Sequence, residues 1–86
     1  MDENQCKKAI ITLLEKRADD TTICPSEVAR SLAQTIRSPE WRGLMSVVHT
    51  AVDDLITEGV VQITWKGKPL DQRVGTYLIR WRPDKG

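Results

Sequence analysis

The sequence contains few of the residues from which metal sites, disulfide frameworks and catalytic centres are built. Its 86 residues include two cysteines and one histidine, whereas a structural zinc site needs four ligands in closely spaced pairs. Cys6 and Cys24 are too far apart for such a pattern, so we expect no disulfide, no metal and no cofactor. Cys24 precedes Pro25 at a predicted helix start, a position at which thiols can act as redox switches, but its apolar neighbours favour burial.

Long apolar runs are also absent. No run approaches the roughly 18 residues that span a membrane, and the N-terminus has no basic segment followed by an apolar stretch. We therefore expect a cytoplasmic protein that does not associate with membranes. The length corresponds to about one domain, so residues 1–86 are expected to fold as one unit.

The common catalytic arrangements are missing as well. Asp53 and Asp54 are adjacent, so on a helix their side chains point about 100° apart and cannot share one site. His49 has no serine or acid at a spacing that would orient it, and a lone histidine on a polar helical face is usually solvated. Gly67 and Gly75 lie between strands and precede no helix, unlike a phosphate loop. We expect that the protein is not an enzyme.

Aromatic residues are scarce, with three tryptophans, one tyrosine and no phenylalanine. With so few rings, each tryptophan is expected to anchor the core. Trp41, Trp65 and Trp81 occupy the inward positions of their patterns. An exposed tryptophan would instead suggest a stacking platform for a single strand or a contact with a partner.

The longest periodic pattern runs from Ser38 to Gly59 and predicts a helix with both ends marked. Ser38 suits the N-cap, Pro39 the first helical position, and Gly59 the left-handed conformation that ends a helix. Apolar residues recur at three- and four-residue steps and define one buried face. The opposite, polar face carries Arg42, Ser46, His49, Thr50, Asp53 and Asp54.

Two other helices are expected before this one. Cys6 begins an apolar pattern at helical spacing that continues to about Ala18, and a second helix opens at Pro25 and ends between residues 34 and 37. Between them, residues 21–23 are expected to be extended, with Ile23 pointing inward.

After residue 59 the period changes from about 3.6 to 2, which predicts strands. Residues 60–66 would place Val61, Ile63 and Trp65 on the inner face, and residues 76–82 would pair with them. In this second strand the inner face is expected to carry Tyr77, Ile79 and Trp81. Residues 67–75 form a loop that is too long for a tight hairpin turn, with Leu70 as a possible anchor.

This order of elements (helix, strand, helix, helix, strand, loop, strand) resembles the winged helix-turn-helix superfamily. The expected fold class is α+β, a three-helix bundle with a short strand after the first helix and a two-stranded β-ribbon, the wing. Residues 23–30, 40–45 and 67–71 resemble more narrowly a small bacterial family of uncharacterised winged-helix-like proteins, domain of unknown function 3253. That family implies a fold and brings no established activity, cofactor or catalytic residue.

Charge is divided unevenly along the chain. Residues 1–59 carry seven Lys and Arg against ten Asp and Glu, whereas residues 60–86 carry six against two. In winged-helix proteins the third helix enters the major groove and the wing meets the backbone. The resemblance therefore implies double-stranded DNA as the partner of a transcription-regulator-like domain. Base edges would be contacted by Arg42, Ser46, His49 and Thr50, and phosphates by Lys66, Lys68 and Arg73.

A second interpretation stays open. The third helix carries one arginine on its polar face together with Asp53, Asp54 and Glu58, whereas a DNA-reading helix is usually basic. The same fold would then be a protein–protein interaction module or a homodimer, with Val47 and Leu78 as apolar contacts on polar faces. Arg42, next to Glu40 and Trp41, has a separate structural alternative, in which it only caps and shields the start of the helix.

Overall fold

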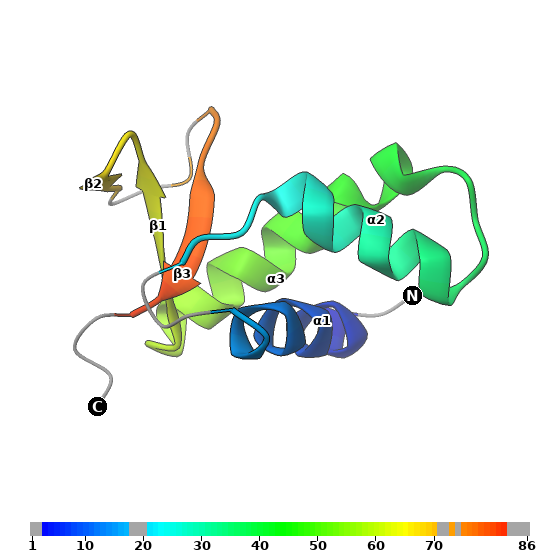
Figure 1. Ribbon diagram of the computed structural model, residues 1–86, viewed down its shortest axis with the longest axis horizontal. Coiled ribbons are helices and arrows are strands. Elements are labelled where there is room, and N and C mark those ends of the chain that lie inside the picture. The colour runs from blue at the N-terminus through cyan, green and yellow to red at the C-terminus, as the bar shows by residue number, and fades with distance from the viewer. Residues whose placement is uncertain (1–2, 18–20, 71–72, 74, 83–86) are drawn as a thin grey trace.

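In a computed structural model, the described residues (3–17, 21–70, 73 and 75–82) fold into three α-helices followed by a three-stranded antiparallel sheet (Figure 1). The class is therefore α+β. The helices are α1 (Glu3–Glu15), α2 (Pro25–Thr35) and α3 (Met45–Thr57), and a 3₁₀ turn, η1 (Trp41–Leu44), leads into α3. The strands are β1 (Val61–Trp65), β2 (Lys68–Pro69) and β3 (Leu78–Trp81). Among the residues described, no helix is long and apolar enough to cross a membrane.

The core lies where the three helices meet one another and the inner face of the sheet. Each element contributes the stripe that its period predicts, so α1 and α3 pack along one another and the sheet covers one end of the helices (Figure 1). The residues in this core are Cys6, Ile10, Leu14, Ile23, Val28, Ala29, Leu32, Val48, Ala51, Val52, Leu55, Val61, Ile63, Tyr77 and Ile79.

The third helix begins later than the sequence pattern predicts. Arg37 has φ 56° and the Ser38 amide donates to the carbonyl of Ala33 at 2.8 Å, so residues that were expected to start α3 instead close α2. Ser38 Oγ accepts from the Glu40 amide at 3.2 Å, and Pro39 lies outside any helix. The 3₁₀ turn η1 is therefore the first helical structure after α2, and α3 begins at Met45, four residues after the start of η1.

The end of α3 and the extended segment after α1 follow the predictions. Gly59 has φ 76°, and the amide of Val60 donates to Leu55 at 2.9 Å, which closes the helix. Ile23 is buried and exchanges two backbone hydrogen bonds of 2.8 Å with Ile79 in an isolated antiparallel bridge. Residues 21–23 thus join the helical part of the chain to β3.

The sheet corrects the prediction of a two-stranded ribbon. Its order is β2-β1-β3, because residues 68–69, predicted to lie in the long loop, form a strand that pairs with β1. Lys66 and Gly67 both have positive φ, 53° and 80°, as in a type I′ turn, and fold Lys68 back against Trp65. A tight turn therefore joins β1 to β2, and the two strands with this turn form the β1–β2 hairpin, residues 61–69. Leu70 packs against the core and its amide donates to Ile63, which confirms it as an anchor.

One tryptophan prediction is wrong. Trp65 is 39% exposed, because it is the last residue of β1 and lies in the hairpin that projects away from the helices (Figure 1). Thr64, the residue before it in β1, is buried. Trp41 and Trp81 are partly buried and pack against the core. Tyr77 and Ile79, also predicted to point inward, belong to the core itself.

Candidate nucleic-acid interface

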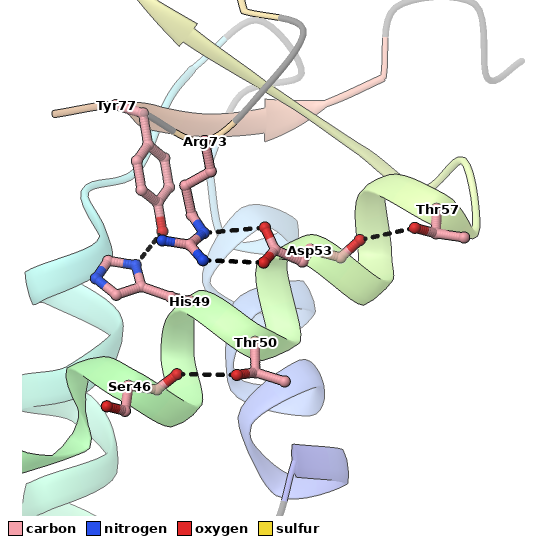
Figure 2. Close-up of polar contacts among 7 residues, drawn as sticks. All are labelled: Ser46, His49, Thr50, Asp53, Thr57, Arg73 and Tyr77. Carbon is pink, nitrogen blue, oxygen red and sulfur yellow. Dashed lines mark hydrogen bonds and ion pairs between the residues drawn. The ribbon is translucent and has the colours of Figure 1, made fainter. Parts of the chain in front are cut away.

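The exposed face of α3 carries hydroxyl groups that are anchored to their own helix. The hydroxyl of Thr50 donates to the carbonyl of Ser46 at 3.1 Å, and that of Thr57 donates to the carbonyl of Asp53 at 3.1 Å (Figure 2). Such bonds fix the rotamer of a threonine and leave the oxygen able to accept another hydrogen bond. Ser46 and Thr50 are both exposed, as expected for side chains that contact a partner.

Asp53, also on the polar face, holds the segment before β3. Its carboxylate accepts two hydrogen bonds from Arg73, 2.9 Å from Nε to Oδ1 and 3.0 Å from Nη2 to Oδ2 (Figure 2). These bonds raise the pKa of Arg73. Arg73, predicted to meet phosphate, is therefore held by a carboxylate in the free protein.

His49 points toward the sheet and is not the solvated residue that was expected. Its Nδ1 lies 2.6 Å from the hydroxyl of Tyr77, and the two rings are tilted by 55° with centroids 5.7 Å apart (Figure 2). Burial, and next the positive charge of Arg73, lower the pKa of His49. Burial also raises the pKa of Tyr77, so that its hydroxyl stays protonated. His49 thus connects α3 to the sheet through a partner 28 residues away.

The other predicted cations are exposed. Lys66 and Lys68 flank Gly67 at the hairpin turn, and the guanidinium carbon of Arg42 lies 4.7 Å from the ring centroid of Trp41. Arg30 of α2, which sequence reasoning did not select, lies 4.6 Å from the same centroid. Within the part of the chain that the structure describes, none of these four cations has a carboxylate or hydrogen-bond partner.

The remaining acids of α3 face α1. Lys7 lies 2.6 Å from a carboxylate oxygen of Glu58 and 3.7 Å from one of Asp54, and Glu3 is 4.0 Å away. The hydrogen bond to Glu58 raises the pKa of Lys7. One ammonium thus faces three carboxylates, so this cluster keeps a net negative charge, which lies beside α1 at the C-terminal end of α3.

A pocket of about 270 Å³ lies beside His49, between the start of α2 and the segment before β3. Cys24 lines it and is exposed, so the expectation that this thiol is buried is wrong. Cys24 precedes the first turn of α2, and its Sγ lies 3.0 Å from the hydroxyl oxygen of Ser26. No cluster of three or more His, Cys, Asp or Glu in the described ranges could hold a metal ion.

Comparison with known families places this α+β chain among proteins without an assigned activity. The chain belongs to the DUF3253 family, described as a protein of unknown function, which matches residues 3–82. A search of curated proteins finds no match.

Proposed function

We propose that the protein binds double-stranded DNA as a small transcription-regulator-like domain, with α3 as the recognition helix. The order of elements supports this function, because an extended segment after α1, a helical corner between α2 and α3, and a basic hairpin are typical of winged helix-turn-helix proteins. In that arrangement the N-terminal half of the third helix enters the major groove and the wing meets the backbone. Here the wing would comprise the β1–β2 hairpin and Arg73.

The observation that carries the proposal is the pairing of charges. Asp53 of α3 pairs with Arg73, whereas Asp54 of α3 and Glu58, the residue after that helix, share Lys7 with Glu3. The lysines of the hairpin turn are, among the described residues, free of such partners. Unpaired cations on a hairpin are suited to contact with a phosphate backbone.

Five of the predicted residues have roles in this proposal that fit their positions. Ser46 and Thr50 are exposed hydroxyls that can donate to or accept from base edges. Lys66 and Lys68 extend from the hairpin turn toward phosphates. His49 supports α3 from behind through Tyr77, and so positions the helix without touching the DNA.

A titration of labelled duplex tests the proposal. If about four phosphates are neutralised, affinity falls roughly a hundredfold between about 50 and 200 mM salt. The double variant Lys66→Gln/Lys68→Gln lowers the slope of log affinity against log salt by about 2. The control Lys8→Gln/Lys16→Gln removes the same charge from exposed positions at α1 and leaves that slope unchanged. Absence of binding at about 50 mM salt, with protein at about 100 µM, defeats the proposal.

A protein–protein interaction is the second candidate, because two large apolar side chains are exposed. Ile36 is 45% exposed and Trp65 is 39% exposed, so each offers apolar surface against which a second chain could pack. The contacts expected from the sequence, Val47 and Leu78, are partly buried, and Val47 packs against the core. Sedimentation of wild type and Trp65→Ser tests this function. A concentration-dependent dimer that the substitution weakens supports it, and a monomer in both cases opposes self-association.

A further inference from the structure

Two arginines from different elements share one aromatic ring. Arg30 lies on α2 and Arg42 on η1, and their guanidinium carbons are 4.6 and 4.7 Å from the centroid of Trp41. Trp41 is partly buried and packs against the core, so its ring is a fixed platform. Both arginines are exposed. Their positions are therefore set by the corner between α2 and α3, and they lie outside the predicted wing.

Stacking on a ring leaves an arginine able to bind an anion. The attraction between a guanidinium and an indole ring restrains the planar group. The N–H donors lie in the plane of the guanidinium, and contact with the face of a ring does not use them. Within the described residues, neither Arg30 nor Arg42 has a carboxylate partner. Two like charges are thus held near each other with their donors unused, which is the arrangement that an anion would stabilise.

We propose that Arg30 and Arg42 form a phosphate-binding pair that holds the DNA backbone beside the start of α3. This inference rests on the proposed function. Because both guanidinium carbons lie within 4.7 Å of one centroid, they are separated by at most twice that distance. One strand of B-DNA carries a phosphate per about 3.4 Å of helix axis, so two neighbouring phosphates can be reached.

The pair changes the role expected for Arg42 and adds a second backbone contact. A guanidinium fixed on Trp41 contacts phosphate, whereas base recognition is left to Ser46 and Thr50. Figure 1 places the green η1 turn and the yellow β1–β2 hairpin far apart along the long axis of the molecule. Backbone contacts at both places would set the register of α3 in the groove, which is what phosphate contacts do in protein–DNA complexes.

The test compares Arg30→Gln and Arg42→Gln with wild type on two labelled duplexes of unrelated sequence, one rich in G·C and one rich in A·T. Each substitution is expected to weaken binding about five- to tenfold near 100 mM salt and to lower the salt slope by about 1. The loss is the same for both duplexes, because phosphates carry no sequence information. Arg30→Lys keeps the charge without the stacked fork and loses less. Lys16→Gln, which removes one exposed charge from beyond the end of α1, is the control and binds as wild type does.

Three results overturn the inference. If Arg30→Gln binds duplex as tightly as wild type, the pair is not a backbone contact, although the proposed function stands. If Arg42→Gln weakens binding only to the G·C-rich duplex, Arg42 reads a base. If wild type binds neither duplex, both the inference and the proposed function fall. Thermal melting followed by circular dichroism checks folding, and if Arg42→Gln is unfolded, the exposed Arg30 decides the outcome alone.

Discussion

Replacing Asp53 with asparagine is expected to strengthen duplex binding. In the free protein the Asp53 carboxylate holds the Arg73 guanidinium by hydrogen bonds of 2.9 and 3.0 Å. A phosphate that recruits Arg73 must displace this carboxylate, whose negative charge also lies on the polar face of α3. The amide of asparagine has almost the same shape and no charge, so Asp53→Asn removes the competitor and frees Arg73.

The size of this gain follows from the exposure of the pair. The side chains of Arg73 and Asp53 are 33% and 47% exposed, and pairs of this kind contribute about 0.2–1 kcal/mol, with bidentate geometry at the upper end. A factor of ten in affinity corresponds to about 1.4 kcal/mol. Breaking the pair therefore lowers the affinity of the wild type by up to about fivefold, and the Asp53→Asn variant avoids this loss. Counterion release predicts a similar gain of about five- to tenfold near 100 mM salt when one more phosphate is neutralised.

Fluorescence anisotropy of a labelled duplex at several salt concentrations measures this effect. Asp54→Asn is the matched control, because it removes the same charge from the next residue, whose carboxylate faces Lys7 of α1. It should change affinity less than Asp53→Asn does. Equal gains from both variants would mean that only net charge matters. A weaker complex with Asp53→Asn would refute the view that the carboxylate competes with phosphate.

The remaining predictions concern stability and reactivity. Burial, and next the charge of Arg73, lower the pKa of His49 below 6.5, so the unfolded chain takes up the proton first. The contribution of His49 to stability is therefore full above that pH and falls as the pH drops below it. Urea unfolding near pH 7.5 and 5.5 should show a lower free energy of unfolding at the lower pH. The His49→Gln variant should show a smaller difference between the two pH values. The exposed Cys24 should react with a thiol reagent in the native protein, whereas Cys6 should react only after denaturation, because burial raises its pKa to about 11. Gly59→Ala should cost about 1 kcal/mol of unfolding free energy in urea titrations, because φ is 76° there and a Cβ would lie 3.4 Å from Arg82 Nη1.

The elements that the sequence predicts well are those whose periodic pattern extends over many residues and whose end is marked by a specific residue. The apolar stripes of the helices, the inward Ile23 and the terminal Gly59 each follow from local chemistry. The start of α3 does not follow from local chemistry, because the residues that resemble its N-cap instead close α2. Arg37 there adopts the left-handed conformation that glycine usually occupies. A two-residue β2 is too short to show any period, although a two-residue turn ending in Gly67 is a signal that could have revealed it.

The candidate interface is less predictable, because its contacts join residues that are distant in sequence. Arg73 and Asp53 are 20 residues apart, and Lys7 and Glu58 are 51 apart. Sequence patterns identify the exposed faces of single elements, and from these Ser46 and the hairpin lysines were selected. They cannot show which acids are already paired, nor that Arg30 reaches a ring on another element.

The most direct test of the proposed interface is an NMR titration of the ¹⁵N-labelled protein with a short duplex at low salt. Binding through α3 and the hairpin predicts that the amides of Ser46, Thr50, Lys66 and Lys68 shift progressively and saturate together. Amides on the outer side of α1, such as Lys8 and Thr12, should stay unmoved. Shifts confined to α1, or a spectrum unchanged at excess duplex, would contradict the proposal that this surface binds DNA.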